Sequence, residues 1–271
     1  VQQALVHNTD IQTAAANLAQ ARALLNQAHA GLFPATSESF GGNFGRSGLG
    51  NFEAGSQGRR AVDTWSYDAA LDVSYEVDLF GQVRRSIEAA RADAQAAAAA
   101  QDGVRITVAA ETARAYADAC AFHEQADVAR QSVQIEQQTF DIALRRRDAG
   151  AASDLDVARA GTLLDQTRAQ IPTLDGQRRS ALYQLAVLTG RPPSQISPDA
   201  EACAAPPRLD RPIPVGDGAA LLRRRPDVKR AERQLAAATA RIGVATANLF
   251  PAVTLGGAAT TGGPTLGSLG R

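Results

Sequence analysis

The sequence contains no methionine, and aromatic residues make up only 5% of its 271 residues. Because position 1 is Val1 rather than Met, we expect the chain to be a fragment of a longer protein. Neither a signal peptide nor an acylated cysteine is found near the start. No run of eighteen apolar residues occurs, which argues against a transmembrane helix. Any membrane crossing would have to be made by β-strands.

An excess of charge is also absent, because 28 basic residues balance 28 acidic ones. A neutral chain gives no reason to expect a nucleic-acid partner. The two cysteines, Cys120 and Cys203, neither define nor exclude a disulfide, and Cys120 with His123 is too small a set for a metal site. No Gly-rich phosphate loop, zinc signature or nucleophile elbow occurs. We expect no enzymatic activity, no cofactor and no bound metal.

The most regular pattern in the chain is the alternation of residues 64–81. A period of two predicts a β-strand. At about 3.3 Å per residue, about fifteen alternating positions reach roughly 50 Å, enough to cross a bilayer. One face carries mainly aromatic and branched side chains: Trp65, Tyr67, Ala69, Leu71, Val73, Tyr75, Val77 and Leu79. The other face is polar and acidic: Ser66, Asp68, Ala70, Asp72, Ser74, Glu76 and Asp78.

These two faces fix the orientation of the strand if it lies in a membrane. The reverse orientation would place several carboxylates in hydrocarbon, which is costly. The residues expected to face lipid are Trp65, Tyr67, Leu71, Val73, Tyr75 and Val77, and those expected to face an aqueous lumen are Asp68, Asp72, Ser74, Glu76 and Asp78. The acidic side chains would either bias a pore toward cations or simply solvate its wall. The strand alone is equally compatible with a long strand of a soluble sheet.

Helices are predicted on both sides of this strand. Residues 4–32 form the first, which is entered near Asn8-Thr9-Asp10 and ends before Pro34. A weaker strand within 36–46 and a Gly-rich loop complete a β-hairpin over 36–79. Residues 82–148 contain no proline and no turn cluster, and they predict a helix of roughly 100 Å.

A return helix over 154–189 is predicted to pair with the later half of 82–148. Both carry apolar and small residues at the spacing of a coiled-coil seam. The seam residues are Val108, Thr112, Ala115, Ala119, Phe122, Ala126, Ala129, Val133, Phe140 and Ala143 on the first helix and Leu164, Thr167, Ile171, Leu174, Ala181, Leu185 and Leu188 on the second. Gly150 is suited to end the first helix, and Ser153 or Asp154 to cap the second. We therefore expect a long antiparallel helical hairpin over 82–189.

The chain also contains an internal repeat at an offset of 217 residues. Asp10 falls on Asp227, and Leu32-Phe33-Pro34 falls on Leu249-Phe250-Pro251. We therefore predict a first repeat over 1–218, which ends in a Pro-rich linker at 190–218. A truncated second repeat follows over 219–271.

A completed second repeat would give each chain four strands. Four strands cannot close a membrane barrel, because the smallest bacterial barrels have eight, and an open sheet edge is not viable in lipid. Several copies of the chain are therefore expected to share one barrel.

Three stretches carry a resemblance to a known family. They are Tyr75-Glu76-Val77-Asp78-Leu79-Phe80-Gly81, Leu222-Arg223-Arg224-Arg225-Pro226-Asp227-Val228, and Ala240-Arg241-Ile242-Gly243-Val244-Ala245 running into Leu249-Phe250-Pro251. Over essentially its whole length the chain resembles the TolC-like outer-membrane efflux proteins, particularly the OprM/NodT branch of lipoprotein channels. The resemblance implies a mainly α fold with membrane β: a coiled-coil hairpin, and strands contributed to a shared trimeric 12-stranded barrel in the Gram-negative outer membrane.

The same resemblance implies a passive conduit in a tripartite efflux system. A homotrimer in outer-membrane lipid would export drugs, metals or other small molecules that an inner-membrane pump delivers through a periplasmic membrane-fusion adaptor. The adaptor would contact the hairpin tip, at Arg147, Asp148, Gly150, Ala151, Ser153 and Asp154. The family's lipidated N-terminal cysteine and second long hairpin are absent here, so this fragment alone is not expected to form a working channel.

Other interpretations remain open at this stage. The tip is alternatively an ordinary solvated turn. The basic runs Arg145–Arg147 and Arg223–Arg225 are better explained by their places beside helix ends than by an anion site. The alternative function is that of a periplasmic coiled-coil scaffold or adaptor without a pore. A lipid-facing strand at 65–79 distinguishes the two functions, because a scaffold has no use for one.

Overall fold

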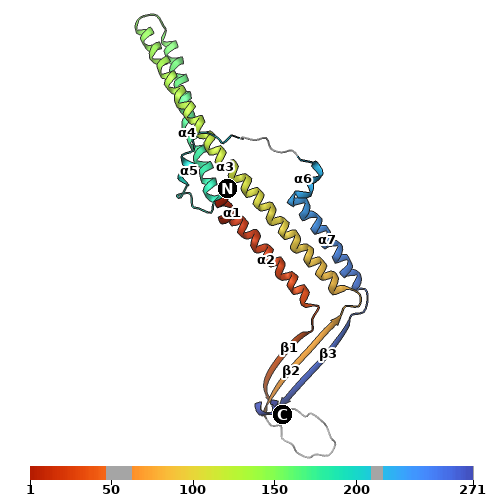
Figure 1. The fold of residues 1–271 in the computed structure, drawn as a ribbon. Helices are drawn as coiled ribbons and strands as arrows, with labels where there is room; N and C mark the ends of the chain where they lie inside the picture. Colours follow the sequence, from red (N-terminus) through yellow and green to blue (C-terminus); the bar gives the residue numbers. More distant parts are fainter. Residues whose placement is uncertain (47–62, 209–215, 271) are drawn as a thin grey trace, which may run out of the picture. The chain divides into compact units, whose positions relative to one another are not determined.

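The computed structural model describes residues 1–46, 63–208 and 216–270 of the chain (Figure 1). The chain forms two compact units. One contains Val1–Ala19 and Ala97–Arg230, and the other contains Gln20–Ala96 and Ala231–Arg271. Of the helices in the described residues, none is long and apolar enough to cross a membrane.

The N-terminal segment is divided into α1 (Gln2–His7) and α2 (Thr9–Ala30), so the single helix predicted over 4–32 is wrong at its start. Asn8 separates the two helices in an extended conformation, with φ −66° and ψ 132°. The expectation of a helix entry near Asn8 is confirmed for α2.

The Asn8 side chain stabilises this break by hydrogen bonds to both α2 and α4 (Asp154–Leu188). Its side-chain oxygen accepts hydrogen bonds from the amides of Asp10 and Ile11, at 2.8 and 3.2 Å, and so caps α2. Its side-chain nitrogen donates to the carbonyl oxygen of Leu188 at 3.1 Å. This second bond joins residues 180 positions apart, which explains why local sequence periodicity does not reveal the break.

The predicted hairpin is formed by α3 (Gln82–Asp148) and α4 (Asp154–Leu188). Its helices run antiparallel, because Arg130 of α3 bonds to Asp175 of α4, while Gln137, later in α3, bonds to Arg168, earlier in α4. The predicted seam residues are all buried or half-buried. The seam prediction is therefore confirmed, with one refinement: Val108 packs with residues of the first two helices rather than with α4.

The segment after α4 is attached to the hairpin by a disulfide between Cys120 and Cys203, whose Cα atoms are 5.2 Å apart. Just before Cys203, the short helix α5 (Pro198–Glu201) places Ala200 in a buried cluster with Ala119 of α3 and Leu182 of α4. The predicted Pro-rich linker is thus partly ordered against the hairpin.

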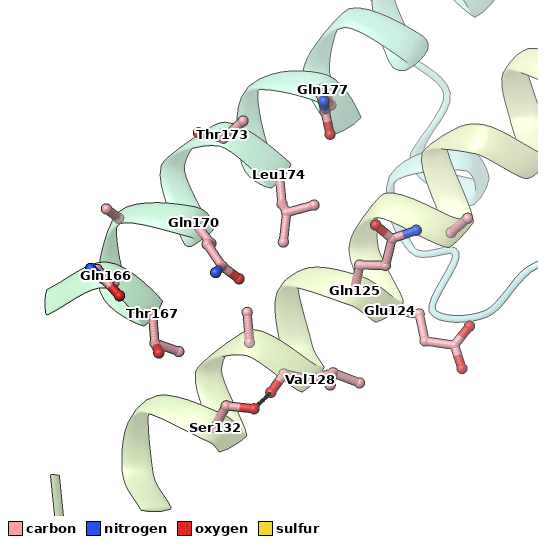
Figure 2. A pocket seen from close by; sticks show the side chains of 13 residues that line it. Glu124, Gln125, Val128, Ser132, Gln166, Thr167, Gln170, Thr173, Leu174 and Gln177 are labelled. Carbon is pink, nitrogen blue, oxygen red and sulfur yellow. Dashed lines mark hydrogen bonds between the residues drawn. The ribbon is translucent and has the colours of Figure 1, made fainter. Parts of the chain in front are cut away.

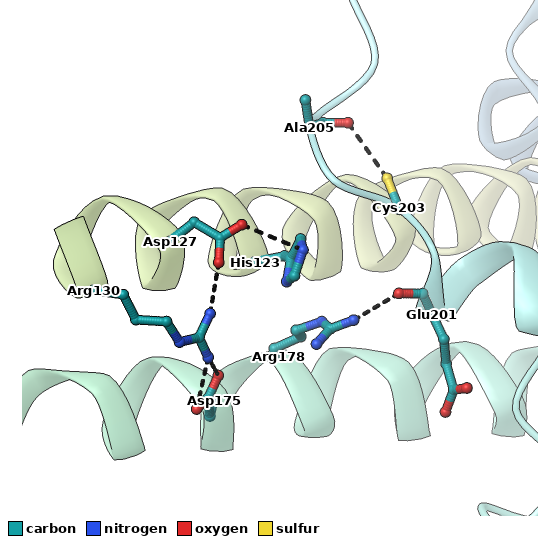
Figure 3. Close-up of polar contacts among 8 residues, drawn as sticks. All are labelled: His123, Asp127, Arg130, Asp175, Arg178, Glu201, Cys203 and Ala205. Atoms are coloured by element: carbon teal, nitrogen blue, oxygen red, sulfur yellow. Dashed lines mark hydrogen bonds and ion pairs between the residues drawn. The ribbon is translucent and has the colours of Figure 1, made fainter.

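The ion pairs of the hairpin centre on Arg130 (Figure 3). Its guanidinium lies 2.6 Å from Asp127 on the same helix and forms two bonds of 2.9 and 3.1 Å to Asp175 on α4. The hydrogen bond to Asp127 is the largest of the effects that raise the pKa of Arg130. Nearby, Arg178 donates to the carbonyl oxygen of Glu201 at 2.6 Å and ties α5 to α4.

The last helices repeat the first ones. α6 (Gly218–Arg224) and α7 (Pro226–Ala247) are separated by Arg225, whose φ of −64° and ψ of 124° are close to those of Asn8. Helices α2 and α7 each contain 22 residues, and their bounds differ by the offset of 217. The secondary structure therefore follows the sequence repeat, although each compact unit contains parts of both predicted repeats.

The second unit contains a three-stranded antiparallel sheet in the order β1-β2-β3. Its strands are β1 (Ala35–Arg46), β2 (Asp63–Val77) and β3 (Val253–Gly263), and a short 3₁₀ helix, η1 (Leu266–Gly270), follows β3. The predicted strand at 36–46 is confirmed. The central strand ends at Val77, two residues before the predicted end at Leu79. Most of the Gly-rich loop predicted between these two strands lies outside the described residues.

Candidate functional site

The sheet exposes two chemically different faces, and their composition follows from the register. Residues paired across antiparallel strands point to the same side of a sheet. Phe40 pairs with Ala69 and Phe44 with Trp65, while Leu255 pairs with Tyr75. The apolar face of β2 therefore continues onto both neighbouring strands. We call this surface the apolar face: the odd-numbered residues of β2 and β3 and the even-numbered residues of β1.

The predicted lipid-facing residues all lie on this apolar face. Trp65 is 50% exposed, Leu71 49% and Val73 38%, while Tyr67, Tyr75 and Val77 are half-buried. Trp65 stacks on Tyr67 with ring centroids 5.8 Å apart, and it contacts Phe44 at 5.1 Å.

Aromatic rings also gather at the opposite end of the sheet, where the strands join the helices. Phe80 stacks on Phe250 with ring centroids 4.6 Å apart. Both side chains are about half exposed. Large apolar surface is thus left uncovered at both ends of the strands.

The opposite side of β2, which we call the acidic face, carries Asp68, Asp72 and Glu76 at a spacing of four residues, with Ser74 between the last two. Its neighbours are small: Asp68 pairs with Gly41 on one side and with Gly262 on the other. A Cβ atom added at Gly41 would lie 2.7 Å from the Asp68 carboxylate oxygens, so a side chain there would displace the carboxylate. The structure thus brings four of the five predicted lumen residues onto one face.

Asp78, the fifth predicted lumen residue, has a different position. It follows the end of β2, and its carboxylate accepts hydrogen bonds from the amides of Val83 and Arg84, at 3.1 and 3.0 Å. It therefore caps the start of α3, and its assignment to the strand is wrong. The strand pattern concealed this role, because a carboxylate two residues after Glu76 continues the alternation although the strand has already ended at Val77.

One side chain of the apolar face was missed in the sequence. Glu38 of β1 pairs with Leu71 of β2 and so shares a face with Phe40 and Trp65. The strand at 36–46 has too many glycines for its faces to be separated by periodicity, and the register was needed to place Glu38.

The hairpin tip is built from two complementary helix caps. Gly150 has φ +73°, its amide donates to the carbonyl of Arg147, and the amide of Ala151 donates to the carbonyl of Arg146, both at 2.8 Å. This pattern ends α3 in a Schellman motif, for which glycine is suited. The predicted role of Gly150 as a helix terminator is confirmed.

The start of α4 is a capping box formed by Ser153 and Asp156. The Asp156 carboxylate accepts hydrogen bonds from the Ser153 hydroxyl at 2.7 Å and from its amide at 3.0 Å. These bonds lower the pKa of Asp156 below its usual value, the hydroxyl contributing most. Of the two predicted caps, Ser153 is the correct one, and Asp154 is the first residue of the helix.

Charge at the tip is paired within the turn itself. The Arg147 guanidinium lies 2.6 Å from a carboxylate oxygen of Asp148 and 4.0 Å from one of Asp154. The pKa of Arg147 is raised, mainly by its hydrogen bond to Asp148. The backbone caps keep the exposed residues Gly150 and Ala151 in a defined conformation.

A groove of about 780 Å³ with a mixed polar and apolar lining runs between α3 and α4 (Figure 2). Its wall combines the amide side chains of Gln125, Gln166, Gln170 and Gln177 with apolar residues that include Val128 and Leu174. Its lining residues include a single carboxylate, that of Glu124, and no basic group. The groove therefore has the chemistry of a hydrated helix surface rather than that of a catalytic site.

Metal ligands are not gathered in the described parts of the chain, where no group of three or more His, Cys, Asp or Glu residues could hold an ion. Cys120 is bonded to Cys203, which removes it from the pair with His123 considered above. Of the basic runs, Arg225 forms an ion pair with Asp227 at 2.7 Å.

The chain is similar to several known proteins. A family model described as outer membrane efflux protein matches residues 1–191. Nodulation protein T of Rhizobium leguminosarum bv. viciae is 33% identical over 257 residues, which cover 94% of this chain and 51% of that protein. The pyoverdine export outer membrane protein OpmQ of Pseudomonas aeruginosa is 33% identical over 268 residues, which cover 97% of this chain and 55% of that protein.

Solved structures give the same result. The structure of the outer-membrane channel OprN matches this chain with a TM-score of 0.87 and 32% sequence identity, over 99% of this chain and 59% of that chain. The chain spans about half the length of the curated relatives it matches. The predicted TolC-like fold class is confirmed, and OpmQ and OprN are described as an export outer membrane protein and an outer-membrane channel. The chain belongs to the outer membrane efflux protein family.

Proposed function

We propose that this chain forms part of a passive outer-membrane conduit of a tripartite efflux system. The observation that carries the proposal is the sheet: an apolar face and an acidic face are both exposed along strands of 11 to 15 residues. A transmembrane strand needs about 9–11 residues, with apolar side chains toward lipid and polar ones toward water. The relatives described as outer-membrane export proteins support the same function.

The strand count supports assembly from several copies. The described part of the sheet has three strands in open order, so β1 and β3 each have one edge without a partner. Unpaired edges are not viable in lipid. In the proposed homotrimer each copy contributes four strands, three of them present here, to a shared barrel of 12 strands.

The two faces then acquire roles in the barrel. The apolar face, with Trp65, Leu71 and Val73, contacts lipid. The acidic face, with Asp68, Asp72, Ser74 and Glu76, lines the lumen and keeps it hydrated. The chain contributes no catalysis and no cofactor, and the energy for export comes from an inner-membrane pump.

The tip is the proposed contact with a periplasmic adaptor, through which the pump is reached indirectly. Support comes from its construction: the caps at Gly150 and Ser153 hold an exposed turn in one conformation. The small exposed side chain of Ala151 leaves room for close approach by a partner.

The first experiment measures the cross-linked mass of the full-length protein extracted from outer membranes in mild detergent. A trimer is the expected result. A water-soluble monomer or dimer would overturn the conduit and favour a periplasmic scaffold.

A second experiment tests the tip. Ala151→Trp is expected to reduce cross-linking to the co-expressed adaptor by about tenfold or more, because hot spots at interfaces exceed about 1.4 kcal/mol. Ala158→Trp, on an exposed position of α4, is the matched control and should not change it. Equal losses of cross-linking in the two variants, with trimer yield unchanged, would show that the adaptor does not bind at this turn.

A further inference from the structure

Helix α7 carries a line of apolar side chains that the described residues leave largely exposed. The line advances by alternating steps of three and four residues, which is the spacing of a coiled-coil seam. We call it the α7 seam: Val228, Ala231, Leu235, Ala238, Ile242, Ala245 and Leu249. Leu235 is 70% exposed, Ile242 67% and Leu249, which follows the helix, 82%. Exposed apolar residues in such a regular line indicate a surface that another helix covers.

The same line occurs in α2, where it is covered. The offset of 217 residues places the α7 seam on identical or similar residues: Ile11, Ala14, Leu18, Ala21, Leu25, Ala28 and Leu32. Ile11 and Leu18 are each 7% exposed, and only Leu32, at the end of the line, is exposed. Ile11 packs with Val104 and Val108 of α3. The line in α2 is therefore a packing seam, and its partner at Ile11 is the long helix of the same predicted repeat.

Helix α7 packs on α3 through a different side. Its buried residues are Ala237, Ala240 and Ala247, none of which belongs to the seam. With 3.6 residues per turn, these three lie on the far side of the helix from the seam. A Cβ atom added at Gly243, on that same far side, would lie 3.0 Å from the Arg85 side chain of α3. The seam is therefore left free for a second helix.

We infer that the α7 seam is the docking surface for the long helix of the completed second repeat, the counterpart of α3 within the same chain. Helix α3 shows what such a partner presents, because Val104 and Val108 are the side chains that pack on Ile11. A duplicated seam keeps its packing when its partner is duplicated with it. The chain covers 51% of nodulation protein T and 55% of OpmQ, so proteins of that length have room for such a helix. The inference concerns packing within one chain and holds with or without a shared barrel.

The first test measures how fast single introduced cysteines in the purified full-length protein react with a water-soluble maleimide, with wild type giving the background. Leu235→Cys is expected to react at least about tenfold more slowly than Ala236→Cys, because a packed seam is reached only by local opening. Ala236 is the matched control: it is exposed, and it lies about 100° further round the same helix. Leu18→Cys, the covered counterpart in α2, should react as slowly as Leu235→Cys. Equal rates for Leu235→Cys and Ala236→Cys would overturn the inference.

The second test identifies the partner of the seam. A photoreactive benzoylphenylalanine in place of Ile242 is expected to give an adduct of monomer mass, joined to a peptide of the second repeat. An adduct of dimer mass would place a second copy on the seam, and an adduct with lipid would place the seam in the membrane. Either result, or no adduct within the chain, overturns the inference.

The outcomes separate this inference from the proposed function. A trimer in which Leu235→Cys reacts as fast as Ala236→Cys keeps the conduit and overturns the docking surface. A protected seam in a protein that is not a trimer overturns the conduit and keeps the docking surface.

Discussion

The helical hairpin covers its apolar side chains with its own helices. Ala126 is fully buried on α3, and Leu164 on α4 is 3% exposed. Small residues allow the helices to approach closely, and Arg130 joins them by an ion pair. In the sheet, by contrast, none of the described residues of β1, β2 or β3 is buried, although Trp65 and Leu71 are large and apolar.

This difference shows where the stability of each region comes from. The hairpin contains its own core, so its folding is internal to the chain. The sheet has backbone hydrogen bonds that set its register, but the described side chains of its strands are not buried within the chain. In the proposed barrel, lipid and other copies would cover them. Substitutions in the two regions should therefore affect different measurements: stability for the hairpin and membrane assembly for the sheet.

The largest effect is expected for Val73→Asp on the apolar face. In the proposed barrel a carboxylate there would face hydrocarbon once in every copy, so we expect assembled protein in outer membranes to be almost absent. Asp72→Asn, one residue away on the acidic face, should be tolerated. The measurement is the amount of trimer in isolated outer membranes. Equal losses for the two variants would contradict the orientation of the strand.

Leu164→Ala tests the internal core of the hairpin. It removes a side chain that is 3% exposed and should lower the free energy of unfolding by about 2–5 kcal/mol. Leu163→Ala, at a position that is 48% exposed, is the control and should change it by less than about 0.5 kcal/mol. Thermal unfolding followed by circular dichroism measures both. A similar shift in the two variants would mean that the seam has been placed on the wrong helix face.

The disulfide adds a second internal constraint to the hairpin. Replacing Cys120 and Cys203 together by Ser should lower the free energy of unfolding by about 2–4 kcal/mol, because the bond closes a loop across a sequence separation of 83 residues. Urea unfolding of the wild-type protein, once with the disulfide intact and once after reduction, measures the same difference in the free energy of unfolding without mutation. If neither treatment shifts the transition, the linker is held by the packing of α5 instead.

The smallest effect is expected at the tip, where both helix ends are exposed. Asp156 has a lowered pKa in the folded chain, so its contribution to stability is present above the unfolded-state value of about 3.9 and is lost as pH falls through the folded-state value below it. Amide exchange at the start of α4 should lose protection over that range in wild type. The Asp156→Asn variant should show little additional loss of amide protection at the start of α4 over the same pH range. A Ser153→Ala variant should cost about 1 kcal/mol at neutral pH.

Much of the fold was predictable because its signals are local. The absence of turn residues predicted both ends of α3, and alternation predicted β2 to within two residues of its end. Gly150 tolerates the positive φ at which a helix ends, and the Ser153 hydroxyl can cap the start of a helix. Both properties can be recognised without reference to the rest of the chain.

Most of the missed features depend on partners distant in sequence, whereas the hydrogen bonds of Asp78 reach only five and six residues along the chain. The break at Asn8 uses the carbonyl of Leu188, and the bond between Cys120 and Cys203 joins a helix to a linker. Asp78 continues the pattern of β2 while bonding to α3. The face on which Glu38 lies could be assigned only from the pairing of β1 with β2. The glycines of β1 carry no side chains, so no alternation of apolar and polar residues is visible in that strand.

The disulfide has a mechanical consequence for the chain. Tension applied between a point before Cys120 and a point after Cys203 passes through the sulfur–sulfur bond, because this is the shorter covalent path. The backbone between them, which includes the tip at Gly150, lies outside that covalent path. A pull between two such points therefore does not pass along the covalent backbone of the tip.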